Sequence, residues 1–155
     1  MIRRTRHELI ALIALILSIR LKPAPSYSSP EALARACGID LDLVRQVEAV
    51  GMLRSEPSRP GRCYDADDAR LMAVVAELLD LGITGDDIVV YGERMLDRCG
   101  KCELDWCPTR CDATEVLEEM LRRLLVRAGA GKGSRSRVAR IERAIASMRA
   151  LDDLI

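Results

Sequence analysis

Residues 28–53 read SSPEALARACGIDLDLVRQVEAVGML, and this stretch decides the fold class. Ser29 and Pro30 form a strong helix start, because the serine side chain accepts a hydrogen bond from the first turn and proline already has a helical φ. Gly38 ends this helix, and Asp40 can cap a second one whose apolar residues recur at helical spacing. Two short helices joined by a tight turn containing glycine form a helix-turn-helix.

The residues that follow are predicted to leave helix and then re-enter it. Residues 54–64, RSEPSRPGRCY, hold two prolines and a glycine, so we expect a loop or a short hairpin. Asp65 begins a further helix, with Asp68 in the position of a capping box, and Gly82 ends it. Thr84 opens another helix, which runs to a group of cysteines.

Four segments of this region resemble the MerR family of bacterial regulators. Residues 33–39 (LARACGI) are similar to the first helix and turn of the family, and residues 44–53 (VRQVEAVGML) to its recognition helix. Residues 64–68 (YDADD) resemble the end of its wing, and residues 81–88 (LGITGDDI) the helix turn behind it. The resemblance extends over residues 28–92.

The resemblance implies a fold and a function. The fold is mainly α: a winged helix-turn-helix with a small β wing, followed by a cysteine-rich loop and C-terminal helices. The function is that of a sequence-specific transcriptional regulator. Regulators of this family act as homodimers that bind palindromic promoters in double-stranded DNA and distort them, so that RNA polymerase can engage an overlong spacer.

The chemistry of the side chains agrees with DNA recognition. Arg45 and Gln46 lie on the helix that resembles the recognition helix. They offer a guanidinium and an amide, which suit guanine and adenine edges. In the loop, Arg54, Arg59 and Arg62 would hold phosphates beside the groove. Tyr64, which follows them, would order the wing. The predicted DNA-binding residues are Arg45, Gln46, Arg54, Arg59, Arg62 and Tyr64.

The charge distribution leaves an alternative open. The chain has 24 basic and 24 acidic residues, so its net charge is zero. Residues 26–90 carry six basic and twelve acidic side chains. DNA binding therefore requires the arginines to gather on one face, because phosphates respond to the local field. The alternative is a protein-interaction adaptor that does not bind DNA, with a degenerate helix-turn-helix and a structural zinc site.

A cluster of four cysteines predicts a metal centre. Cys99, Cys102, Cys107 and Cys111 are separated by two, four and three residues. Four thiolates in one loop can hold Zn²⁺ or an iron–sulfur cluster, and the two are near even. The redox-sensing branch of the MerR family also has clustered cysteines with a Cys-Pro step, and this resemblance favours iron–sulfur slightly. Two disulfides, or a redox thiol pair, are the alternatives to a metal.

The amino terminus holds nine consecutive apolar residues at 9–17, preceded by arginines. The run is too short to span a bilayer, which needs about 20 residues, and no signal cleavage site follows it. We expect a buried or oligomer-forming helix over residues 7–21 rather than a signal peptide or a membrane-surface anchor, and therefore a cytoplasmic protein.

The carboxy-terminal part predicts two further helices, at about 112–128 and 136–154, each with an apolar stripe. We expect the dimer contact to be formed by one of these helices or by both, with the helix at 7–21 as a further candidate. No catalytic base, nucleophile pair or nucleotide-binding loop is recognisable, so an enzyme is not expected, and a redox electron carrier remains a rival. The predicted parts are the N-terminal helix and linker (1–25), the MerR-like module (26–98), the cysteine loop (99–111) and the C-terminal helices (112–155).

Overall fold

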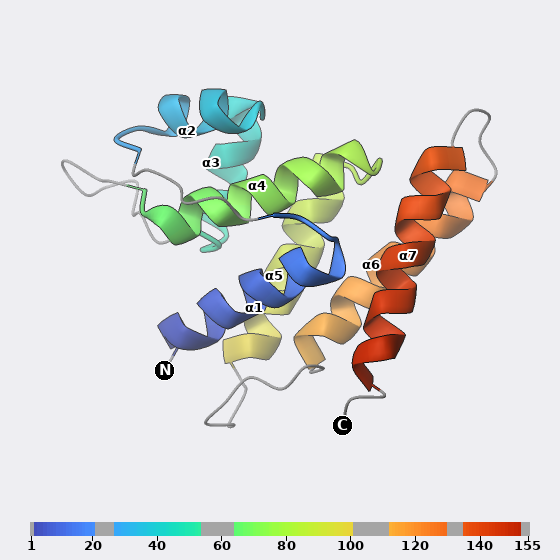
Figure 1. Ribbon diagram of the computed structural model, residues 1–155. Coiled ribbons are helices and arrows are strands. Elements are labelled where there is room, and N and C mark those ends of the chain that lie inside the picture. Colours follow the sequence, from blue (N-terminus) through green and yellow to red (C-terminus); the bar gives the residue numbers. More distant parts are fainter. Residues whose placement is uncertain (1, 21–26, 54–63, 101–111, 130–134, 153–155) are drawn as a thin grey trace.

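The computed structural model describes residues 2–20, 27–53, 64–100, 112–129 and 135–152, and within these ranges it contains seven helices and no strand (Figure 1). The mainly α prediction is confirmed. The helices are α1 (Ile2–Ile16), α2 (Pro30–Cys37), α3 (Leu41–Ala49), α4 (Ala66–Asp80), α5 (Gly85–Gly100), α6 (Asp112–Gly129) and α7 (Arg135–Asp152).

Capping interactions predicted from the sequence set several of the helix ends. The Ser29 hydroxyl accepts a hydrogen bond from the Ala32 N–H at 3.1 Å, and Gly38 closes α2 in the left-handed region at φ 67°. Asp65 and Asp68 form the reciprocal capping box of α4, as expected. Asp40 lies at the N-cap of α3, but its side chain forms no capping hydrogen bond, so that detail of the prediction was wrong.

The helix-turn-helix packs onto α4 and α5. Helix α2 lies against α3 and α4, and α3 also contacts α5. Leu33 of α2, together with Val44 and Val47 of α3, is fully buried in a core that continues through the rest of the chain. These apolar residues fix which face of α3 remains outside.

Helix α1 packs one face against the core. Its apolar residues Leu9, Ile10 and Ile13 are buried, and the helix contacts α4, α5 and α7. The helix ends at Ile16, before the predicted residue 21, because Ser18 adopts a left-handed conformation at φ 57° and the chain turns there. None of the described helices is both long and apolar enough to cross a membrane.

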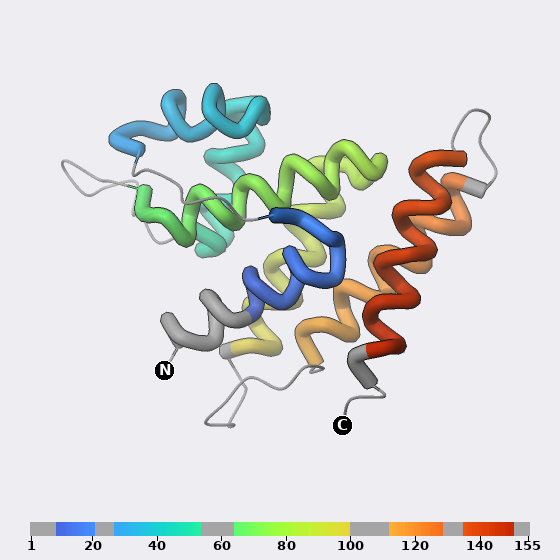
Figure 2. Tube along the Cα trace, viewed as in Figure 1, coloured from blue at the N-terminus to red at the C-terminus, as the bar shows by residue number. Residues whose placement is uncertain are grey.

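Helices α5, α6 and α7 follow one another along the chain and pack in the same order (Figures 1 and 2). The apolar stripes of α6 and α7 are buried within this chain, which is where residues such as Leu117, Leu121 and Ile141 find their contacts. Dimerisation through these helices stays a prediction, and their stripes are already covered without a second copy.

The β wing requires a correction, because the described residues form no strand or sheet. A single antiparallel bridge joins Tyr27 and Tyr64, whose backbones exchange hydrogen bonds of 2.9 and 2.7 Å. The chain turns into helix almost at once on both sides, since Ser29 and Asp65 are the N-caps of α2 and α4. Among the described residues, the strand pairing is therefore limited to this bridge. Residues 54–63, where the wing was predicted, lie outside the described residues.

Candidate nucleic-acid interface

The outer face of α3 carries the two predicted base-reading residues. Arg45 and Gln46 are exposed, whereas Leu43, Val44 and Val47 turn inward. This alternation follows from the helical period, because positions three and four apart share a face. The structure therefore presents a guanidinium and an amide side by side on the second helix of the helix-turn-helix.

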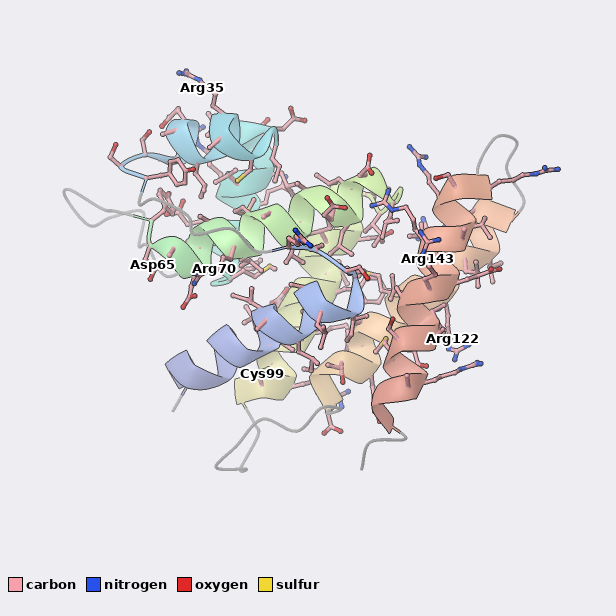
Figure 3. All side chains as sticks on the ribbon, in the orientation of Figure 1. Arg35, Asp65, Arg70, Cys99, Arg122 and Arg143 are labelled. Carbon is pink, nitrogen blue, oxygen red and sulfur yellow. The ribbon has the colours of Figure 1, made fainter. Side chains whose placement is uncertain are left out.

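Arg45 has a partner on the neighbouring helix. Its guanidinium lies 3.6 Å from the carboxylate of Glu31 on α2, and the two side chains are 59% and 53% exposed. Ion pairs this exposed contribute about 0–1 kcal/mol, so a phosphate or a base edge can displace the carboxylate. Arg35 projects from α2 into solvent (Figure 3).

Acidic groups share this surface with the arginines. Asp40, at the N-cap of α3, and Asp42, in the first turn of α3, are both exposed. The described part of the interface thus mixes two arginines with three carboxylates, counting Glu31, and it forms no positive patch by itself. Arg54, Arg59 and Arg62, the predicted phosphate contacts, lie outside the described residues.

Tyr64 lies in the interior rather than on the candidate interface. Its side chain is 0% exposed, and its hydroxyl donates a hydrogen bond of 2.9 Å to Oε2 of Glu48 on α3. The Tyr64 side chain thus has no exposed surface for a direct contact with DNA, and its predicted part in DNA binding, to order the wing, stays a prediction. The hydrogen bond to Glu48 anchors Tyr64 against α3, directly before the N-cap of α4.

Sequence reasoning missed Glu48, the partner of Tyr64. It is only 6% exposed, although glutamate is usually found at the surface. One signal was present: Glu48 follows the buried Val44 by four residues, so it belongs to the same inward face of α3.

The cysteine segment begins at the end of α5. Cys99 lies in the last turn of that helix, half-buried against the core. Cys102, Cys107 and Cys111 lie outside the described residues, and no cluster of three metal-binding side chains occurs within the described ranges. Because α5 and α6 pack against each other, the segment joins two helices whose mutual position is fixed.

Polar contacts fix that position along the length of α5 and α6. Arg94 donates to Glu119 at 2.8 Å, and Arg127 contacts Asp87 at 3.0 Å. The hydrogen bond from Arg94 holds the pKa of the Glu119 carboxyl below its usual range. These contacts cross between the two helices, and Asp87 and Arg94, which lie seven residues or about two turns apart on α5, share one side of that helix.

Cys37 stands apart from the cluster. It lies at the end of α2 and packs partly against the core, where burial raises the pKa of its thiol. Because the thiolate is the metal-binding and nucleophilic form, this thiol is poorly suited to either role. Its packing is that of a small apolar side chain.

A comparison with protein-family models, with curated proteins and with solved structures found no match to this chain.

Proposed function

We propose that this protein is a DNA-binding transcriptional regulator, acting in the cytoplasm, whose helix-turn-helix is coupled to a metal or iron–sulfur centre held by Cys99, Cys102, Cys107 and Cys111. The observation that carries the proposal is the outer face of α3, where Arg45 and Gln46 stand exposed together above a fully buried apolar face. A second helix presented in this way is the element that enters the major groove in helix-turn-helix proteins.

Helix α5 provides the connection between the two parts. Near its start Gly85 lies against Leu43 of α3, and Gly92 lies so close to Met52 that a methyl group added there would meet the sulfur at 2.5 Å. Cys99 is in the last turn of the same helix. The helix spans about 24 Å at 1.5 Å per residue, so a rearrangement at the cysteines can reach α3 through one rigid element.

Arg45→Ala is expected to weaken binding to a selected DNA site by about 5- to 100-fold, since a bidentate arginine–guanine contact contributes about 1–3 kcal/mol of discrimination. The site would be selected from a random duplex library with the wild-type protein. Binding is then measured by fluorescence anisotropy at several salt concentrations.

The matched control is Arg122→Ala, which removes an exposed arginine from α6 at a distance from α3 (Figure 3). It should leave affinity for the selected site unchanged. Selection that enriches no sequence, or equal losses in the two variants, would contradict the proposal. A regulator should also lose affinity steeply as salt rises, because counterions are released from the phosphates.

The second candidate function is that of a protein-interaction adaptor with a structural zinc site. It is favoured by the carboxylates of Glu31, Asp40 and Asp42, which share the exposed surface with Arg35 and Arg45. Such a surface suits a protein partner with mixed charges. The salt series separates the candidates, because an adaptor should show no affinity for DNA at any salt concentration.

Cys102→Ser is expected to remove most of the metal from protein purified without oxygen, because a centre with four thiolate ligands loses one of its bonds. Iron and zinc content would be measured together with the visible spectrum. Iron with a brown absorption identifies a cluster, and colourless stoichiometric zinc identifies a zinc site.

Cys37→Ser is the matched control, since Cys37 lies on α2 and is not one of the four clustered cysteines. It should retain the full metal content. Metal-free wild-type protein, or the same loss in both variants, would overturn the assignment of the four cysteines.

A further inference from the structure

A polar pocket of about 380 Å³ lies where the end of α1 meets α4 and α7. Its lining includes neither a residue of α3 nor Cys99. Part of its lining is apolar and includes Ile16 and Leu81. The polar lining residues are Ser18, Arg20, Glu77, Arg140 and Arg143.

One of the three arginines is already paired. The guanidinium of Arg140 lies 2.8 Å from the carboxylate of Glu77 and 2.7 Å from that of Asp80, both on α4. The hydrogen bond and charge of Arg140 hold the pKa of the Asp80 carboxyl below its usual range, and the charge of Arg137 adds to this. The two carboxylates therefore fix Arg140 at the pocket wall.

The other two arginines lack such a partner. Arg20, in the loop after α1, and Arg143, on α7 (Figure 3), form no ion pair with any described residue. Both line the same concave surface. No described carboxylate lies within ion-pair distance of either guanidinium, and Arg137 and Arg140 together balance the charges of Glu77 and Asp80. The charges of Arg20 and Arg143 therefore leave the pocket positive, which attracts an anion.

In the loop after α1, side chains rather than backbone N–H groups are available to bind a ligand. Ser18 turns the chain at φ 57°, and the backbone N–H groups of Leu17, Ser18 and Ile19 all donate back into α1. The Ser18 hydroxyl and the guanidinium groups remain to contact a ligand. Guanidinium groups bind phosphate and carboxylate oxygens through paired N–H donors.

We propose that this pocket binds a small molecule with a phosphomonoester group, with Arg20 and Arg143 as its main cationic contacts. A phosphomonoester carries up to two negative charges near neutral pH, which matches two uncompensated arginines. The volume lies within the range of about 300–1,000 Å³ typical of small-molecule sites, so it holds more than a bare phosphate. The proposal does not depend on DNA binding by α3.

The test is titration calorimetry on the full chain at constant ionic strength. The probes are glycerol 3-phosphate, inorganic phosphate, succinate as a dicarboxylate, and a short DNA duplex. Glycerol 3-phosphate should bind in a saturable way and at least as tightly as inorganic phosphate. Arg20→Ala and Arg143→Ala should each weaken it about 10-fold or more, as expected for the loss of a hydrogen bond to a charged group.

Arg149→Ala is the matched control, because this exposed arginine lies on α7 outside the pocket lining. It should leave binding unchanged. Four results would overturn the proposal: no saturable binding of either phosphate probe, equally tight binding of succinate, equal losses in Arg149→Ala and Arg143→Ala, or binding of the DNA duplex alone that depends on Arg143. Far-ultraviolet circular dichroism of each variant should match that of the wild type, since all three arginines are exposed.

Discussion

Tyr64→Ala is expected to lower the free energy of unfolding by about 3–5 kcal/mol, the range found when a large aromatic side chain is removed from a core. The ring is fully buried, and its hydroxyl donates to the buried carboxylate of Glu48. Most domains are stable by only about 5–15 kcal/mol, so the loss is a large part of the total. It would be measured by urea denaturation followed by circular dichroism.

Tyr64→Phe separates the ring from the hydroxyl. This variant keeps the packed ring and removes only the donor to Glu48, so we expect a smaller loss of about 1–3 kcal/mol. Tyr27→Phe is the matched control, because the Tyr27 hydroxyl forms no hydrogen bond with a described residue, and it should change stability by less than about 0.5 kcal/mol. A loss below about 1 kcal/mol for Tyr64→Ala would show that the ring is not part of the core.

The burial of the Tyr64 side chain was not visible in the sequence. Tyrosine has an apolar ring and a polar hydroxyl, so it suits both a core and a ligand contact. The buried acceptor that decides between them is Glu48, sixteen residues earlier on a different helix. Only the packing of the segment after residue 63 against α3 brings these groups together.

Helix ends were predicted well where the signal is local. Ser29, Gly38 and the Asp65–Asp68 box act through residues three or four positions away, so a single sequence shows them. The end of α1 was missed because Ser18, a residue not expected in the left-handed region, takes the place that glycine usually has. The backbone there is held by the Ile19 N–H, which donates to the Ala14 carbonyl at 2.8 Å.

The pocket beside α7 had no signature along the chain. Arg20 comes from a loop near the amino terminus and Arg143 from the last helix, and each looks like an ordinary surface residue in its own segment. They come together because α1 packs against both α4 and α7. Sites made by distant segments depend on tertiary packing, which periodicity and capping do not encode.

The dimer contact predicted for α6 also depends on tertiary packing, which the sequence pattern does not show. The apolar stripe of α6 predicted a dimer contact, because an amphipathic helix must bury its apolar face against some surface. In the structure that surface is supplied by α5 and α7 of the same chain. The apolar stripe predicts that α6 packs against another surface but not which one, since a stripe looks the same whether it packs within a chain or between two chains.

Leu121→Ala tests this account, and we expect it to lower the free energy of unfolding by about 2–5 kcal/mol. Leu121 is fully buried on α6, and its loss leaves a cavity in the α6 packing. Val126→Ala is the matched control on the same helix, because Val126 is 77% exposed and its truncation should change stability by less than about 0.5 kcal/mol. If the chain itself covers the stripe, the wild-type unfolding midpoint is independent of protein concentration. A midpoint that rises with concentration would instead couple folding to association, and the stripe of α6 would then need a second copy to be stable.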